Sequence, residues 1–187
     1  VALQFLTSDY TIEYWVYTTS FSVLSVHLDF RTSNGASGGA IQIYSTTGGI
    51  MTVYGGSSTA TLLVTAGAAI SLSTWTHIAL TRASNSTKLF INGTQSGSTA
   101  TDSTSYGLGA MWIGTIASAG NSFLTGYISN LRITKGQALY TTTFTPATSP
   151  LTTTSQGATA ANVSLLTCQS AIFSDNSTNS PNSITVN

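Results

Sequence analysis

The chain has 187 residues, of which 41% are hydrophobic and only 5% are charged. Its five basic and five acidic residues cancel to a formal net charge of zero, so it lacks the basic surface that binding to nucleic acid or to an anionic membrane needs. No apolar run approaches the roughly 18 residues that span a bilayer. We therefore expect neither a nucleic acid partner nor insertion into a membrane.

Length and aromatic content indicate one folded domain. A chain of this size can bury a full core, and all-β domains of about 200 residues are usually single. The three Trp, eight Tyr and seven Phe are spread along the sequence, which a disordered composition would lack. The single cysteine, Cys168, cannot form an internal disulfide, so stability does not depend on a disulfide framework.

The first half of the chain alternates apolar and polar residues with a period of two, which is typical of half-buried strands. In the first clear strand, residues 10–17, the even-numbered residues form one face and the odd-numbered residues the other. A turn is expected at 33–39, where Gly, Ser and Asn gather. The further strands predicted in this half are at residues 24–30, 41–43, 50–54, 62–64 and 70–72.

The most regular segment is WTHIALTRASNSTKLFINGT, residues 75–94. It predicts a strand at 78–81, a small polar turn at 83–87 and a second strand at 88–92. Asn92-Gly93 then accepts positive φ at both central positions of a type I′ turn, so another strand should run straight back. The segment therefore predicts a meander of antiparallel sheet.

The remainder of the chain continues the strand pattern and then loses it. Strands are predicted at 111–113 and 127–133 among glycine-rich turns, and no helical period of useful length occurs. From residue 141 the chain is rich in Thr, Ser and Pro, and Pro146 and Pro150 cannot donate to a central ladder. This segment should run extended over the surface as a wrapping arm. A closing strand is predicted at 163–168, followed by a short apolar run at 184–186.

Three motifs follow one another in the sequence: YTIEYWVY at 10–17, the hairpin at 75–94, and GYISNLRITKGQALY at 126–140. They resemble the F-T-I-E-x-W-V strand, the W-x-H-[IV]-A hairpin and the G-x-I-x-x-[LV]-R-[IV] strand of the concanavalin A-like lectin/glucanase superfamily, in its laminin G-like and pentraxin-like branch. The resemblance implies an all-β fold, an antiparallel two-sheet jelly-roll sandwich over residues 1–151. Residues 152–187 are then the wrapping arm and closing strands of the same domain, which could continue into a longer chain.

Members of this branch usually carry a longer strand before the first motif than residues 1–9 supply, so one sheet edge is expected to be uncovered. Three explanations stay open. The chain is part of a longer polypeptide, or residues 184–186 fill the gap, or a neighbouring subunit donates the strand.

The C-terminal third has a second resemblance. The F-T-P segment, the SLLTCQS strand and the FSDNSTN run, within residues 126–187, are similar to sandwich domains of structural proteins in marine tailed bacteriophages. This implies a non-enzymatic module on the virion surface, in a fibre, spike or capsid decoration, whose partners are other virion proteins and further copies of itself. A surface of Ser, Thr, Asn and Gly with near-zero net charge favours such association.

The alternative function is carbohydrate binding by an extracellular protein, with a host-surface glycan as partner. A neutral sugar site needs an aromatic face and a few amide or hydroxyl groups, without charge. The aromatic candidates in or beside turns rich in Asn, Ser and Thr are Trp112, Tyr106, Tyr54 and Tyr44. The competing interpretation of each is packing on the sandwich rim or against a neighbouring subunit. Trp15 and Trp75 are assigned to packing.

Catalysis by a glycan hydrolase is a third and weaker hypothesis, because hydrolysis needs two carboxylates flanking one sugar bond. The acidic residues are Asp9, Glu13, Asp29, Asp102 and Asp175, and none forms the superfamily's E-x-D-x-x-E array. Glu13 is expected to be a strand carboxylate bonded to Arg or Tyr. His27 and His77 lack a G-x-S-x-G nucleophile elbow, so we predict no enzyme activity and no catalytic residue.

The resemblance also raises calcium as a cofactor, because pentraxin-like and laminin G-like domains often hold it in an acidic rim site. Ca²⁺ takes six to eight oxygens. Asp29, Asp102 and Asp175 are distant in sequence, so a site would need their loops to meet. The competing interpretation is that Asp102 and Asp175 are turn residues that bond their own backbone. We predict no required metal or cofactor.

Overall fold

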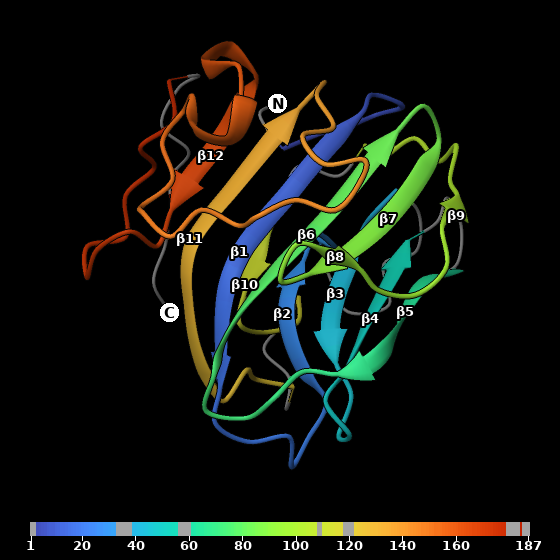
Figure 1. Ribbon diagram of the computed structural model, residues 1–187, viewed down its shortest axis with the longest axis vertical. Helices are drawn as coiled ribbons and strands as arrows, with labels where there is room; N and C mark the ends of the chain where they lie inside the picture. The colour runs from blue at the N-terminus through green and yellow to red at the C-terminus, as the bar shows by residue number, and fades with distance from the viewer. Residues whose placement is uncertain are drawn as a thin grey trace.

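A computed structural model describes residues 3–32, 39–55, 61–107, 110–117, 122–178 and 184. The chain forms two antiparallel β-sheets packed face to face, as the jelly-roll sandwich predicts (Figure 1). The strands are β1 Tyr10–Thr18, β2 Ser25–Asp29, β3 Gln42–Ser45, β4 Ile50–Gly55, β5 Thr61–Ala69, β6 Trp75–Ala83, β7 Ser86–Ile91, β8 Thr94–Gln95, β9 Ala100–Thr101, β10 Trp112–Ile113, β11 Gly126–Lys135 and β12 Val163–Thr167, with 3₁₀ turns at Ser155–Gly157 and Ala160–Asn162.

The two sheets combine strands that are far apart in sequence. The seven-stranded sheet has the order β12-β11-β1-β6-β7-β8, with β9 also paired to β7, and the five-stranded sheet has the order β10-β2-β3-β4-β5. β1 therefore lies in the middle of its sheet, between β11 and β6, and β12 extends the same sheet from the C-terminal part of the chain. Both sheets are antiparallel throughout the pairs described.

The core lies between the sheets and follows the predicted alternation. Tyr10, Ile12, Tyr14 and Val16, the even-numbered face of β1, are all fully buried. Each such side chain contributes roughly 1.5–3 kcal/mol by leaving water. Across from β1, the five-stranded sheet supplies Leu28, Ile43, Met51, Val53 and Val64 to the same hydrophobic cluster.

The β6–β7 hairpin is tighter than the predicted turn at 83–87. β6 continues to Ala83 and β7 begins at Ser86, because Ser84 and Asn85 both take positive φ, at 47° and 67°, in a two-residue connection. The Asn92-Gly93 turn forms as predicted, with φ of 50° and 81°, and β8 follows it. The strand predicted at 62–64 is confirmed within a longer strand, β5, which runs to Ala69. The strand predicted at 70–72 is wrong, because these residues lie between β5 and β6 and form no strand.

Residues 136–154, here named the strap, form no strand or helix and cross the outer face of the seven-stranded sheet (Figure 1). Within the strap, Tyr140 and Phe144 stack with centroids 3.6 Å apart and planes 6° apart. They pack on Ala79 and Phe90 of the sheet below. The strap thus makes a small second core on the outside of the sandwich.

The N-terminal segment and Ile184 both contact the main core. Leu3 and Phe5 are buried, and Ile184 is partly buried against the same cluster. The other residues of the predicted run at 184–186 lie outside the described residues, as does the turn predicted at 33–39 apart from Gly39.

Candidate functional site

The outer face of the five-stranded sheet carries three of the four predicted aromatic residues. Strand register aligns Trp112, Asp29, Gln42 and Tyr54 in one row across β10, β2, β3 and β4. Tyr44 follows Gln42 by two residues, so it shares this face. The half-buried rings of Tyr44 and Tyr54 lie nearly parallel, with centroids 5.8 Å apart and planes 13° apart. The structure therefore brings these two tyrosines together and places Trp112 farther along the same face.

The face is electrically neutral. Asp29 is the only formally charged residue in β2, β3, β4, β5 and β10, and Arg31 directly after β2 pairs with it, Nη2 to Oδ2, at 2.7 Å. Asp29 also accepts hydrogen bonds from the Ala117 N–H at 3.0 Å and from Gln42 Nε2 at 3.4 Å. The carboxylate charge is thus balanced by a guanidinium that remains 16% exposed.

Tyr44 is a neutral group at physiological pH. Burial first, and then the adjacent Tyr54 hydroxyl, raise the pKa of Tyr44 to about 12. Its hydroxyl therefore stays protonated and can donate a hydrogen bond. With Gln42 and Thr52 on the same face, the tyrosine pair has amide and hydroxyl groups beside it.

Tyr106 does not meet the prediction of a sugar-contacting residue, because its side chain is only 1% exposed. Its hydroxyl donates to Asp102 Oδ2 at 2.9 Å, and its ring packs edge-on against Tyr10 with centroids 6.2 Å apart. Arg82 lies over the same ring, 5.1 Å from the centroid. Arg82 Nη1 and Asp102 Oδ2 form a buried ion pair at 3.7 Å, so Tyr106 is a core residue that contacts both of its members.

The three candidate calcium ligands are already occupied and do not meet. Asp102 accepts the Thr104 N–H at 3.1 Å, and Asp175 accepts the Ser177 N–H at 2.9 Å, which confirms both as turn residues that bond the backbone. Asp29 is paired with Arg31. Among the described residues, no three His, Cys, Asp or Glu side chains gather as metal ligands would. These residues do not fit a calcium site.

Glu13 has the structural role that the sequence predicts. Its carboxylate accepts from Arg132 Nε at 2.9 Å and from the Tyr140 hydroxyl at 2.8 Å, and His77 Nε2 lies 3.4 Å away. Burial raises the pKa of Glu13, but the His77 hydrogen bond and the Arg132 charge outweigh burial and leave it below its ordinary value. A glycosidase acid needs a raised pKa and access to substrate, and Glu13 is 1% exposed.

His27 is also sealed inside the molecule. Its ring lies between the Tyr14 hydroxyl, 3.1 Å from Nδ1, and Ser45 Oγ, 3.3 Å from Nε2, and it is fully buried between the two sheets. Burial lowers the pKa of His27 to about 3, so the ring is neutral at physiological pH. The His27–Ser45 pair is inaccessible to a substrate, which leaves it a structural link between the sheets.

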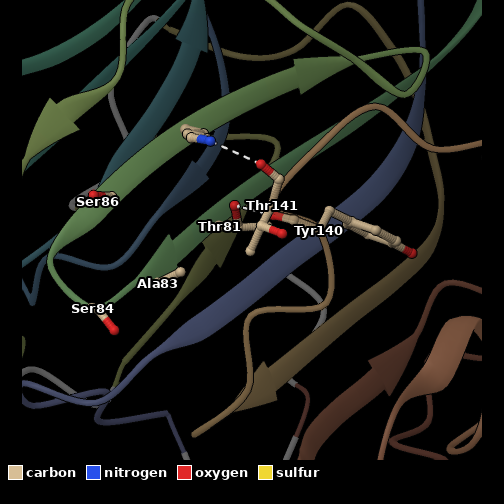
Figure 2. Close-up of a pocket in the computed structure, with 7 residues that line it drawn as sticks. Thr81, Ala83, Ser84, Ser86, Tyr140 and Thr141 are labelled. Carbon is tan, nitrogen blue, oxygen red and sulfur yellow. Dashed lines mark hydrogen bonds between the residues drawn. The ribbon is translucent and has the colours of Figure 1, made fainter.

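A shallow hollow of about 240 Å³ lies between the strap and the β6–β7 hairpin (Figure 2). Figure 2 shows Tyr140 and Thr141 of the strap beside Thr81 of β6. Lys88 Nζ donates a hydrogen bond to the Thr141 carbonyl at 2.8 Å. The lining residues are Thr81, Ala83, Ser84, Ser86, Lys88, Tyr140 and Thr141. None of these seven side chains carries a carboxylate, so the hollow has no acid pair for sugar hydrolysis.

Trp75, which the sequence assigns to packing, contacts Tyr17 with ring centroids 5.6 Å apart, and its side chain remains 44% exposed. It joins Tyr17 and Tyr127 in an aromatic cluster on the outer face of the seven-stranded sheet. The sequence places Tyr17 on the outer face of its strand by alternation alone. Only the strand register shows that Trp75 and Tyr127 lie directly beside it.

Comparison with known proteins agrees with the fold. The family model described as concanavalin A-like lectin/glucanases superfamily matches residues 2–141. No curated protein matches. Among the described residues, no helix has the length and apolar character to cross a membrane.

Solved structures with a similar fold include carbohydrate-binding proteins and laminin. The CBM40 module of a Ruminococcus gnavus IT-sialidase, bound to α2,3-sialyllactose, has a TM-score of 0.60 and 17% identity over 73% of this chain and 80% of its own. A Bacteroides ovatus protein described as carbohydrate-binding has a TM-score of 0.58 and 16% identity over 86% of this chain and 45% of its own. Mouse laminin α1 domains LG4-5 have a TM-score of 0.56 and 14% identity over 80% of this chain and 44% of their own.

Proposed function

We propose that this chain, which belongs to the concanavalin A-like lectin/glucanase superfamily, is a non-catalytic module that binds neutral glycans. The observation that carries the proposal is the Tyr44–Tyr54 pair on the outer face of the five-stranded sheet. Its two nearly parallel rings lie on neighbouring strands, beside Gln42 and Thr52. The site is therefore held by regular sheet and needs little reordering to bind.

The chemistry of this face suits an uncharged sugar. The C–H face of a pyranose ring packs against an aromatic ring, while its hydroxyls exchange hydrogen bonds with amide and hydroxyl side chains. Tyr44 keeps its proton at physiological pH and can donate. Because Arg31 is already paired with Asp29, the described residues of this face offer no unpaired cation to a sialic acid carboxylate. We therefore favour neutral glycans over the acidic glycan that the CBM40 module binds.

A glycan array followed by titration calorimetry on the best neutral ligand tests the proposal. The double variant Tyr44→Ala/Tyr54→Ala should bind at least about tenfold more weakly, since 1.4 kcal/mol of lost stacking corresponds to that factor. Leu6→Ala is the control, because Leu6 is an exposed apolar residue, at 48%, outside the named strands. Binding by the wild type that is equally strong in the double variant would contradict the proposal.

Trp112→Ala tests how far the site extends. Trp112 shares the row of Tyr54, with Asp29 and Gln42 between them. A loss of affinity only for longer oligosaccharides would assign Trp112 to an outlying part of the site. An unchanged affinity for long and short ligands would limit the site to the tyrosine pair.

A second candidate function is assembly on a virion surface, in a fibre, spike or capsid decoration of a tailed bacteriophage. The observation that favours it is a pair of adjacent exposed apolar residues, Ile172 at 76% and Phe173 at 49%, in a chain of zero net charge. Light scattering of the wild type and of Ile172→Ser/Phe173→Ser tests it. An oligomer that the substitutions dissociate supports assembly through this segment, and a monomeric wild type argues against homo-oligomers.

A further inference from the structure

Three aromatic residues form a row across the outer face of the seven-stranded sheet, on the opposite side of the molecule from Tyr44 and Tyr54. Tyr17 of β1 is directly opposite Trp75 of β6 on one side and Tyr127 of β11 on the other. The Tyr17 ring centroid lies 5.6 Å from that of Trp75 and 6.1 Å from that of Tyr127. Trp75 is 44% exposed and Tyr127 is 64% exposed, so the row is open to solvent.

The row lies at the end of the sheet that the strap leaves bare. Figure 1 shows the strap crossing the middle of this sheet, whereas the row lies at the end of β1 and the beginnings of β6 and β11. Trp15 marks the boundary. Its ring is 5.3 Å from His77, whose other neighbour is Phe144 of the strap at 5.7 Å. The strap therefore packs on one part of this aromatic face and leaves the rest exposed to solvent.

The surroundings of the row are uncharged and rich in hydroxyl groups. Because residues two positions apart share a strand face, the relevant neighbours are Trp15, His77 and Ser129 within the strands and Thr19, Ser73 and Thr125 just beyond them. None of them carries a formal charge. The rings of Trp75 and Tyr127 are tilted relative to that of Tyr17 by 56° and 52°. Such a surface offers stacking partners without selecting a charged ligand.

The size of the row favours a saccharide over a protein partner. An aromatic side chain has roughly 150–250 Å² of surface to bury, and only about half of it is exposed here, so three rings offer a few hundred Å². A standard protein interface needs about 800 Å² from each partner. A sugar chain needs much less area, because ring faces and a few hydroxyl partners suffice to orient it.

We propose that Trp75, Tyr17 and Tyr127 form a second saccharide-binding face, which takes a neutral polysaccharide lying across β6, β1 and β11. The inference adds a face to the proposed function and does not depend on the Tyr44–Tyr54 pair. Because the two faces lie on opposite sheets, one module can hold two sugar chains or two segments of one matrix. Retention on an insoluble polysaccharide then exceeds what either face gives alone.

Pull-down on insoluble cellulose, chitin and mannan, with four variants, tests this inference. The variants are Trp75→Ala/Tyr127→Ala, Tyr44→Ala/Tyr54→Ala, the combination of all four substitutions, and Leu6→Ala as the control. We expect Trp75→Ala/Tyr127→Ala to lower the partition constant roughly tenfold. The fourfold variant should lose retention altogether, and Leu6→Ala should match the wild type. Circular dichroism on each variant verifies that the fold is intact. If Trp75→Ala/Tyr127→Ala does not fold, Tyr127→Ala replaces it in the pull-down.

The outcomes separate the two proposals. Loss of retention only in Trp75→Ala/Tyr127→Ala supports the second face and overturns the tyrosine pair. Loss of retention only in Tyr44→Ala/Tyr54→Ala supports the tyrosine pair and overturns the second face. No retention of the wild type on any of the three polysaccharides overturns the second face, as does an oligomer that Trp75→Ala/Tyr127→Ala dissociates without changing retention, because the row is then a protein interface.

Discussion

The outer face of the seven-stranded sheet has two parts, one covered by the strap and one bare, and they carry different side chains. Under the strap, the outer face of the seven-stranded sheet holds a buried carboxylate, Glu13, with Arg132, Tyr140 and His77 around it. At the bare end of the same face, the residues are uncharged aromatics that remain exposed. Alternation along β1 generates both parts. The strap decides which residues become a second core and which remain available to other molecules.

The largest expected effect is at Arg132, which connects the sheet to the end of the strap. Its Nη1 donates to the carbonyls of Thr152 and Ser155 at 2.7 and 2.8 Å, and its Nε and Nη2 bind Glu13. Arg132→Met leaves a buried carboxylate without its cation, so we expect a loss of about 3–5 kcal/mol in the free energy of unfolding, measured in urea.

Lys88→Met is the matched control for the Arg132 variant. Lys88 also holds the strap, through the Thr141 carbonyl, but its contact is solvent-exposed. We expect its loss to stay below about 1 kcal/mol. If the two variants lost equal amounts of unfolding free energy, the buried Arg132–Glu13 ion pair would not stabilise the part of the sheet that the strap covers.

Gly93 tests the contact between the β7–β8 turn and the strap. Its φ is +81°, and a Cβ there would collide with the carbonyl oxygen of Phe144. Gly93→Ala should therefore cost about 3 kcal/mol, the sum of left-handed strain and displacement of the strap. Gly136→Ala is the control, because Gly136 has a φ of +77° and open space around its Cβ position. It should cost only about 1–2 kcal/mol. Similar losses in thermal unfolding would argue that the strap is loosely held.

His27 is buried without an opposite charge beside it, whereas Glu13 is buried together with the Arg132 cation. Burial lowers its pKa from 6.5 to about 3, so between these values the unfolded state binds more protons than the folded state. Stability contributed by neutral His27 is therefore complete above pH 6.5 and declines as the pH falls toward 3. At pH 5 we expect a loss of about 2 kcal/mol relative to pH 7.5. His27→Gln should remove this part of the pH dependence of the melting temperature, and an unchanged slope would contradict the assignment.

The smallest expected effect on stability is at the bare end. Tyr127→Ala should change the free energy of unfolding by less than about 0.5 kcal/mol, because its side chain is 64% exposed. Phe90→Ala, fully buried under the strap on the same sheet, should cost about 3–5 kcal/mol. A large loss in Tyr127→Ala would mean that the row stabilises the fold and is not reserved for a ligand.

Local patterns in the sequence were sufficient for much of the fold. Alternation identified the core face of β1, and Asn92-Gly93 fixed its turn because both residues accept positive φ. The pattern failed where the residues are small, at the end of β5. Residues 66–69, Ala-Gly-Ala-Ala, have low strand propensity, yet pairing of Ile50 with Ala69 keeps β5 continuous to Ala69.

The candidate site depended on contacts that no local pattern contains. Tyr106 lies in a turn-rich segment and was expected at the surface, but a bridge to Leu6 and the partners Asp102 and Arg82 place it in the core. The exposure of Trp75 depends on where the strap crosses the sheet. Tyr44 and Tyr54 met because a hairpin pairs their strands, which the sequence did indicate.

An NMR titration of the aromatic ring protons with a soluble neutral oligosaccharide tests the central claim most directly. The claim is that uncharged aromatic residues on the outer faces of the sheets bind neutral glycans. It predicts shifts of the Tyr44 and Tyr54 ring signals at low ligand concentration, while the buried ring of Tyr106 stays unchanged. Shifts confined to the hollow between the strap and the β6–β7 hairpin, with Tyr44 and Tyr54 unaffected, would contradict it.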